Sequence, residues 1–300
     1  MTTYYAAAGG HVDWTILGDV IFRLIECSRC RLIYQESVPT PRMLDELYNV
    51  MIDQSFLRRF EHEKLTRDGW AEVSGELQTL FNSFQKPYGK LTFLDFGFGF
   101  GRWARVAKGM GARVFATEIS PEKKKAAESL GVEIVDEDSL GQMQFDVVQA
   151  EQVAEHLTRP AETLQMLAQS VAPGGILKVA VPRPGKIKYL LRRFGMPDRA
   201  PQEHCLRHDA SLQGVSDEDY VGVFPLEHLN LFCDKTMELL AVRLNMCIES
   251  KVRSRVLPIG IGSRKDLIRS AGSLAKETAR RAAGAFLKNR GYYVFRAGGM

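Results

Sequence analysis

The sequence predicts an α/β fold built on a mostly parallel sheet. The first observation is an apolar stretch at residues 93–96 that runs into three glycines on alternate residues, Gly97, Gly99 and Gly101, and then into a helical pattern. The second is the alternation of short apolar runs with helical patterns over the residues that follow, which is typical of βαβ units. The third is a composition of 45% hydrophobic and 25% charged residues over 300 positions, enough for one large core with small additions.

The glycine turn is expected to cradle a nucleotide. Glycine allows backbone angles and close approaches that a Cβ atom would block, and the following helix offers unpaired amide groups to a polar ligand. A dinucleotide-binding GxGxxG pattern that starts at Gly97 would need its third glycine at position 102, where the chain has Arg102. This spacing argues against NAD. A purely structural tight turn is the alternative.

The elements after this turn follow in βαβ order. A strand is predicted at residues 113–117, and it ends at Glu118. Ser120 then caps a helix with Pro121 in its first turn, and Gly131 ends that helix. Further strands are predicted at residues 133–135, 145–150, 176–181 and 292–297, further helices at 160–170 and 234–243, and a turn at Pro173-Gly174-Gly175.

The pattern Asp95-x-Gly97-x-Gly99-x-Gly101 resembles motif I of the class I S-adenosylmethionine-dependent methyltransferases. The resemblance implies a Rossmann-like fold with a seven-stranded, mostly parallel sheet whose last strand is antiparallel. It also implies that Asp95 lies near the methionine amino group of S-adenosylmethionine. Glu118 falls where the family places an acid that accepts both ribose hydroxyls, and a solvated strand-end acid is the alternative.

The resemblance names further cofactor-binding residues. Glu151 and Gln152 follow the strand at 145–150 and match the family's cofactor-facing position. One acid just after the strand at 133–135 is expected to approach the adenine, and Asp138 is favoured over Asp136 and Glu137. The nearby His156 is interpreted first as part of the helical structure.

The proposed chemistry requires a base. Methyl transfer from a sulfonium is an in-line displacement, and an oxygen or carbon acceptor must also lose a proton. The EHLNLF run at residues 227–232 resembles a segment of the same family branch, whose Glu-His pair lies at the active site in some sugar methyltransferases. Histidine titrates near neutral pH and a neighbouring carboxylate can raise its basicity, so His228 is the predicted base and Glu227 its helper. The alternative is that this pair braces the loop.

The cysteines indicate the redox compartment and the nature of the N-terminal segment. Only Cys27 and Cys30 are closely spaced among five cysteines, so a reducing compartment is expected and a disulfide framework is not. Their surroundings resemble the second half of a zinc ribbon, but the upstream cysteine pair is missing, so no metal is predicted and apolar neighbours are expected to support the hairpin. The predicted organisation is a degenerate zinc-ribbon-like segment at 1–48, a helical lead-in at 49–90, and a methyltransferase domain at 91–300.

Two insertions are predicted in the last domain, at about residues 183–223 and 251–290. The first is longer than an ordinary connection and is expected to cap the acceptor pocket. Its basic side chains, among them Arg183, Lys186 and Arg192, would suit a phosphate or carboxylate on the acceptor, although a solvated basic face is the alternative. The second is also basic, and docking on the cap or dimerisation is favoured over membrane contact.

The sequence is compatible with three functional classes. The leading one is a methyltransferase that modifies oxygen or carbon on a small molecule: a sugar, nucleotide sugar or secondary metabolite. A nucleic-acid methyltransferase fits the formal charge of +4, but residues 149–152 do not form an NPPY-like motif, so no nucleic-acid partner is expected. The third class is a scaffold that binds the cofactor without catalysis. A cytoplasmic location is expected, because no apolar stretch could span a bilayer and residues 1–10 lack the features of a signal peptide.

Overall fold

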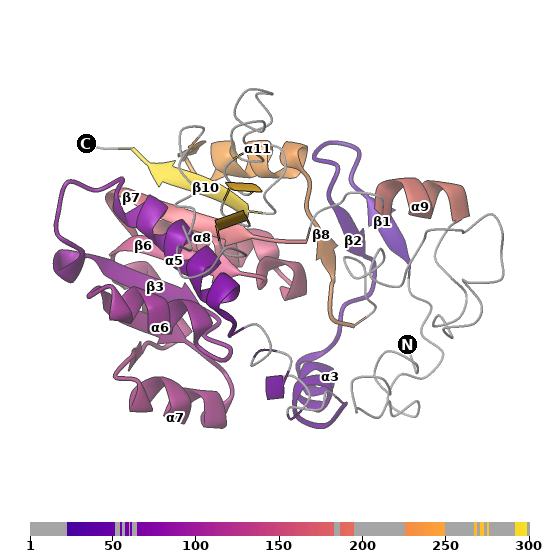
Figure 1. Cartoon of the computed structure of the whole chain (residues 1–300). Helices are drawn as coiled ribbons and strands as arrows, with labels where there is room; N and C mark the ends of the chain where they lie inside the picture. Colours follow the sequence, from indigo (N-terminus) through magenta and orange to yellow (C-terminus); the bar gives the residue numbers. More distant parts are fainter. Residues whose placement is uncertain are drawn as a thin grey trace. The chain divides into compact units, whose positions relative to one another are not determined.

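The computed structural model describes part of the chain, and Figure 1 shows its path coloured along the sequence. The described residues are 23–51, 55, 58–59, 61, 65–182, 187–194, 226–249, 267–268, 271–272, 275 and 292–298. The chain divides into two compact units. The first comprises Met1–His62, Ala154–Pro160 and Val181–Met237, and the second comprises Glu63–Val153, Ala161–Ala180 and Glu238–Met300.

A seven-stranded sheet forms the centre of the second unit. Its strands lie in the order β5 (Glu133–Ile134), β4 (Arg113–Thr117), β3 (Thr92–Phe96), β6 (Phe145–Glu151), β7 (Val171–Ala180), β10 (Tyr292–Ala297) and β9 (Met246–Ile248). The first five strands are parallel, whereas β10 is antiparallel to both of its neighbours. The predicted α/β class, the seven strands and the antiparallel last strand are therefore confirmed.

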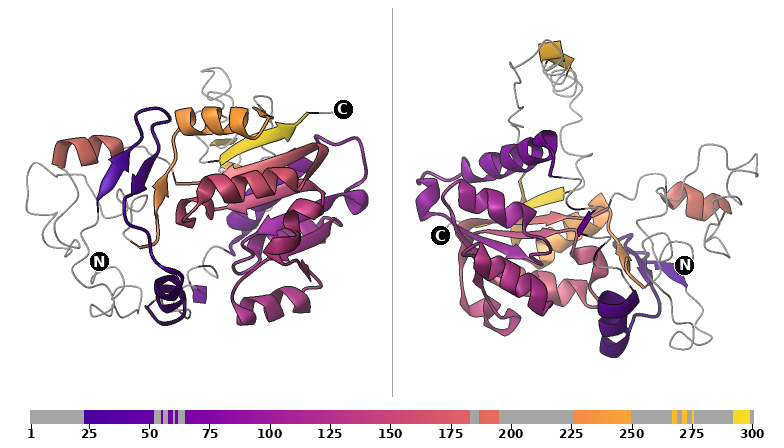
Figure 2. Two further views of the ribbon diagram at one scale, coloured as in Figure 1. Left: turned by 180° about the vertical axis from the view of Figure 1, so that it is seen from behind. Right: turned by 60° about the horizontal axis from the view of Figure 1, so that its bottom comes forward.

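Helices of the second unit lie on both faces of this sheet. Three of them, α5 (Arg67–Phe81), α6 (Arg102–Gly109) and α7 (Pro121–Ser129), share one apolar core with the sheet. Viewed from behind, α8 (Pro160–Gln169) lies over the opposite face (Figure 2, left). The shorter segments are η2 (Tyr88–Lys90) and η3 (Glu137–Gln142), and α11 (Asp234–Arg243) begins in the first unit and ends in the second.

The helical lead-in supplies much of this core. Leu77, Leu80 and Phe81 of α5 are fully buried, and Phe84 packs against the cluster that they form. Phe81 also meets Phe93 of β3 edge to face, with ring centroids 6.1 Å apart, a favourable geometry for aromatic pairs. These contacts make α5 part of the core of the second unit.

The turn predicted at residues 173–175 lies inside a strand instead of preceding one. β7 begins at Val171, and its register against β6 shifts between the Phe145–Val171 and Val147–Ile176 pairs. A Cβ atom on Gly175 would lie 2.7 Å from the carbonyl oxygen of Ala172. The glycine thus allows the chain to bulge within the strand, because no side chain would fit there.

The first unit contains a small antiparallel sheet of β1 (Leu24–Glu26), β2 (Ile33–Gln35) and β8 (Asn230–Leu231). The turn between the first two strands carries Cys27 and Cys30, and it is closed by a 2.8 Å hydrogen bond from the Cys27 amide to the Leu32 carbonyl. Ile33 is buried and its apolar neighbours are half-buried. The predicted hairpin shape is confirmed.

Helical segments complete the first unit. They are α3 (Pro41–Glu46), η1 (Leu47–Met51), η4 (Ala154–His156) and α9 (Ile187–Phe194). Thr40 caps α3 by accepting a hydrogen bond from the Met43 amide. Lys188 of α9 forms a 3.1 Å ion pair with Glu26 of the hairpin.

The two predicted insertions fall largely outside the described residues. Of the first, the structure describes α9, and of the second only residues 267–268, 271–272 and 275. Among the described segments, none is a helix with the length and apolar character needed to cross a membrane.

Candidate active site

The glycine turn after β3 has the backbone geometry that glycine alone adopts readily. Gly97, Gly99 and Gly101 have φ of 82°, 57° and 74°, in the left-handed region. A Cβ atom on Gly101 would lie 2.3 Å from the Phe98 ring, and one on Gly97 would lie 2.8 Å from a Val153 methyl group. At Gly99 no heavy atom comes closer than 3.9 Å. Packing thus requires glycine at two positions, whereas the middle one faces open space.

This turn lies where the strand order of the sheet reverses. β3 has β4 on one side and β6 on the other, and its parallel register with both places the carboxyl ends of all three strands at one edge. The Phe98 amide donates to the Thr117 carbonyl over 2.9 Å, and the Gly97 amide donates to the Thr117 hydroxyl over 3.1 Å. Open α/β sheets bind their ligands outside the carboxyl ends of strands at such a reversal.

Glu118 links two loops at this edge. One carboxylate oxygen accepts a 3.0 Å hydrogen bond from the Gly99 amide. The other accepts 2.9 Å hydrogen bonds from the Ile119 and Ser120 amides, at the start of α7. The half-buried carboxylate is therefore held in place by backbone donors beside the glycine turn.

A row of buried polar side chains crosses the sheet beneath the turn. Asp95 of β3 pairs in register with Gln149 of β6, which pairs in register with Lys178 of β7. All three are at most 2% exposed. Gln149 donates to the Asp95 carboxylate over 3.3 Å and accepts from the Lys178 ammonium over 3.1 Å. The acid predicted to meet the cofactor is thus one end of a buried chain of hydrogen bonds.

Lys178 is enclosed by charge and aromatic rings. Its ammonium lies 2.7 Å from the Glu151 carboxylate, forms a second ion pair with Glu76 of α5, and lies 3.6 Å from the centroid of the Trp103 ring. Burial alone would lower the pKa of Lys178, but the two carboxylates outweigh it and raise that pKa. The lysine therefore keeps its charge inside the protein.

Burial has the opposite consequence for the acids. It raises the pKa of Glu76, and it raises the pKa of Asp95 to about 7. The charge on Glu151 adds to the shift at Asp95, whereas the hydrogen bond from Gln149 opposes it. An approaching cation, such as an ammonium group, would favour the ionised form of Asp95.

The other predicted cofactor residues lie in the second unit as well. Glu151 ends β6, and Gln152 follows it, exposed and with a left-handed φ of 54°. Asp138 is exposed in η3. The described structure thus places the glycine turn, Glu118 and Glu151 at the carboxyl ends of three neighbouring strands, at one edge of the sheet.

The three predicted acceptor-binding residues lie mostly beyond the described part of the chain. Arg183 and Lys186 are outside the described residues, and Arg192 belongs to α9 without a described side chain.

The predicted catalytic pair precedes β8 in the first unit. Glu227 and His228 are both half-buried. The backbone carbonyl of His228 accepts a 3.1 Å hydrogen bond from the Gln35 side chain. Asn230, two residues further on, donates to the Leu157 carbonyl over 2.7 Å. The loop that carries His228 is therefore attached both to β2 and to the segment after η4.

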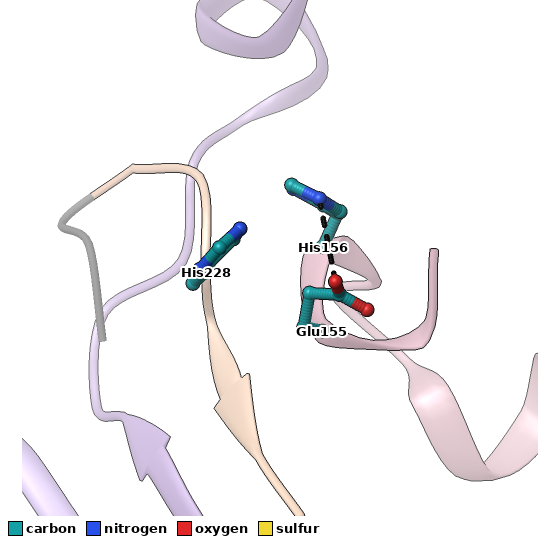
Figure 3. A group of neighbouring side chains, drawn as sticks. All are labelled: Glu155, His156 and His228. Atoms are coloured by element: carbon teal, nitrogen blue, oxygen red, sulfur yellow. Dashed lines mark ion pairs between the residues drawn. The ribbon is translucent and has the colours of Figure 1, made fainter. Parts of the chain in front are cut away.

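His228 lies beside a second histidine and a buried acid (Figure 3). The rings of His156 and His228 meet nearly at right angles, with centroids 4.7 Å apart. Nε2 of His156 lies 3.9 Å from a carboxylate oxygen of Glu155, whose side chain is fully buried. Burial, reinforced by His228, lowers the pKa of His156 to about 3, so this imidazole is neutral at physiological pH.

Sequence reasoning missed two parts of this arrangement. Glu155 was not singled out, and His156 was assigned a structural role, although the pair repeats the Glu-His order of residues 227–228. Lys178 was also missed, but a signal existed: it is the one charged residue in the apolar run of residues 176–181. A charge at a core position of a central strand needs buried partners.

A comparison with protein families decides the class of the molecule. Residues 61–217 match a family model described as a methyltransferase domain, which is more than half of the 300 residues. The chain belongs to this methyltransferase family. The prediction of a methyltransferase enzyme is therefore confirmed. No curated protein sequence matches the chain.

Solved methyltransferase structures are similar to this chain. The plantazolicin methyltransferase BpumL in complex with S-adenosylhomocysteine (SAH) is 14% identical, with 86% of this chain and 94% of that chain covered and a TM-score of 0.50. An S-adenosylmethionine-dependent methyltransferase from Archaeoglobus fulgidus is 16% identical, with coverages of 80% and 98% and a TM-score of 0.44. One from Mesorhizobium loti is 18% identical, with coverages of 74% and 96% and a TM-score of 0.42. The likeness to BpumL confirms the Rossmann-like methyltransferase fold.

Proposed function

We propose that this chain methylates an oxygen or carbon atom of a small molecule, which is a sugar, a nucleotide sugar or a secondary metabolite. The methyl donor is S-adenosylmethionine, in agreement with the family and with the SAH complex of BpumL. The observation that carries the proposal is the glycine turn with the Glu118 carboxylate hydrogen-bonded to its middle glycine. This arrangement offers backbone donors and a fixed acid at the carboxyl edge of the sheet.

The resemblance to motif I supplies the proposed cofactor roles. Gly97, Gly99 and Gly101 let the backbone approach the cofactor, and Asp95 receives its methionine ammonium group. Binding of that cation would ionise Asp95, whose pKa burial has raised to about 7. Glu118 would exchange its hydrogen bond with the Gly99 amide for the ribose hydroxyls.

The remaining cofactor contacts come from three polar residues. Glu151 and Gln152 follow β6 at the same edge, and Asp138 in η3 is the candidate for the adenine. Lys178 orients Glu151 through their 2.7 Å ion pair. We expect Lys178 to act on the cofactor only through that carboxylate, because its ammonium is already paired with Glu151 and Glu76.

For proton removal we propose His228 as the base, with Glu227 beside it. Support comes from its surroundings, since His228 lies among proton-accepting groups of Glu155 and His156. The test is His228→Ala in the full chain. In chelator-treated protein, loss of turnover with unchanged SAH affinity supports the base, and near-normal turnover refutes it. Acceptor charge is tested separately by Arg183→Ala, Lys186→Ala and Arg192→Ala, which should raise the KM of a phosphorylated acceptor more than that of a neutral one.

The cofactor is tested by calorimetric titration of the full chain with SAH, with NAD as the control ligand. Gly99→Asp places a side chain and a negative charge in the open space of the turn, so the protein should fold but lose SAH binding. Gly174→Asp is the matched control, because Gly174 also has a left-handed φ, 72°, and nothing within 4 Å, yet lies in the bulge of β7. SAH binding lost in the first variant alone supports the assignment. Absence of SAH binding by folded, unmodified protein would refute the cofactor assignment, whereas SAH binding without methyl transfer to any acceptor would favour the scaffold.

A further inference from the structure

Three metal-binding side chains converge in the first unit. The candidate ligand atoms of Glu155, His156 and His228 all lie within 4.8 Å of one another. Glu155 and His156 come from η4, whereas His228 comes from the loop before β8 (Figure 3). Residues 72 positions apart in sequence thus present one carboxylate and two imidazoles to the same small volume.

Two groups can hydrogen-bond the His156 ring, the Tyr48 hydroxyl and the backbone carbonyl of Glu227. The Tyr48 hydroxyl lies 3.3 Å from Nδ1 of His156. In the tautomer in which Nδ1–H donates to the Tyr48 hydroxyl, Nε2 carries the lone pair, and Nε2 lies 3.9 Å from Glu155; a bound cation would select this tautomer. Metal-bound histidines commonly use their second nitrogen in this way.

The backbone that carries these side chains is fixed before any ligand arrives. Gln35 binds the carbonyl of His228, and Asn230 binds the carbonyl of Leu157, one residue beyond η4. Both amide side chains are largely buried, with exposed fractions of 3% and 6%. These contacts hold the two donor-bearing segments beside each other, as a prearranged site requires.

We propose that Glu155, His156 and His228 bind a divalent transition-metal ion, with Zn²⁺ as the first candidate. Two imidazole nitrogens and one glutamate oxygen form a ligand set typical of zinc sites that keep an open position. Imidazole favours zinc over magnesium or calcium, and the buried Glu155 carboxylate supplies a negative charge. Zinc ligands lie roughly 3.4 Å apart in a tetrahedral site, so the side chains would move inward by about 1 Å.

The open position has a use that rests on the function proposed above. Water or a hydroxyl oxygen of the methyl acceptor would bind there, and the cation would lower the pKa of that hydroxyl so that its proton passes to water. When the cation is bound, His228 is a ligand and does not act as the base. The cation then promotes loss of the acceptor's proton in place of His228.

The test is titration of chelator-treated full-length protein with ZnCl₂ by calorimetry, together with the visible absorption of the Co²⁺ form. We expect one equivalent of Zn²⁺ to bind, with at least a 100-fold loss of affinity in Glu155→Gln and in His228→Ala. Tyr48→Phe should weaken binding about 10- to 100-fold, since it removes only the partner of the His156 ring. The double variant Cys27→Ser, Cys30→Ser is the control, because these two free thiols are three residues apart and could compete for zinc.

The outcomes separate the cation site from the function. Zinc binding that survives in His228→Ala but disappears in the cysteine variant overturns the proposal, as does absence of zinc binding by folded protein that binds SAH. SAH titration and circular dichroism on the same samples show whether each variant is folded. Zinc binding at the three residues without SAH binding or methyl transfer would support the site and refute the proposed function.

Discussion

The Lys178 ammonium lies 2.7 Å from the Glu151 carboxylate, at the residue where β6 ends. A second ion pair with Glu76 ties the same lysine to α5. The helical lead-in is thereby connected, through one buried cation, to an acid predicted to face the cofactor. Stability and cofactor binding should consequently depend on the same residue.

Replacing that lysine tests this connection. Lys178→Met removes the fully buried cation and leaves two half-buried acids without it, so we expect a loss of about 3–5 kcal/mol in the free energy of unfolding. Urea denaturation measures the loss. Lys125→Met is the control, because Lys125 is exposed on α7 and should change stability by about 0.5 kcal/mol or less. Equal, small effects in both variants would contradict a structural role for the buried ion pairs.

The glycine turn makes a prediction about sterics. Gly101→Ala should destabilise the protein more than Gly99→Ala, although both residues have left-handed φ angles. Alanine in a left-handed backbone conformation costs about 1–2 kcal/mol of stability at either position. Only at Gly101 would the new Cβ atom also collide with the Phe98 ring, which costs about 1–3 kcal/mol more. Urea denaturation of the pair measures the difference, and equal losses would show that Phe98 moves aside freely.

The raised pKa of Asp95 predicts that the stability of the protein depends on pH. Its pKa is about 7 in the folded protein against an ordinary value of 3.8, so the folded state binds the proton more tightly than the unfolded state. The stabilisation is complete below the ordinary value and is lost as pH rises through about 7. The Asp95→Asn variant does not undergo this loss. The difference in unfolding free energy between the variant and the unmodified protein should therefore shift in favour of the variant from pH 5 to pH 8.

The size of that shift should be at least about 1.4 kcal/mol, the equivalent of one pKa unit. Denaturant titrations at several pH values measure it, and Asp138→Asn controls for the loss of a carboxylate on the surface. The same Asp95→Asn variant should lose SAH affinity. A stability difference that does not vary with pH would refute the buried-acid assignment.

Glu118 gives a prediction for binding. Its carboxylate accepts from three backbone amides, and Glu118→Gln would turn a side-chain NH₂ group toward at least one of these donors. We expect SAH affinity to fall at least tenfold and the unfolding free energy to fall by about 1.5–3 kcal/mol. Calorimetry and urea denaturation measure the two effects. Glu122→Gln, on the exposed first turn of α7, is the control, and an equal response there would contradict the assignment.

Local signals predicted most of the second unit. Apolar runs, helix caps and glycine turns depend on residues close together in sequence, and they placed β4, α11 and β10 at their observed residues. The Pro173-Gly174-Gly175 turn was predicted less well. Whether such residues end a strand or bulge within it depends on the neighbouring strand, here β6.

The sequence by itself determined the α/β class, the methyltransferase signature and the hairpin around Cys27 and Cys30. Only the tertiary structure decided which polar side chains meet. Lys178 finds Glu76 about one hundred positions earlier in the chain, and His228 finds His156 across 72 positions. The reason is physical: strand and helix patterns record local periodicity, whereas contacts between buried charges and between candidate ligands depend on strand order and on loops fixed by hydrogen bonds from Gln35 and Asn230.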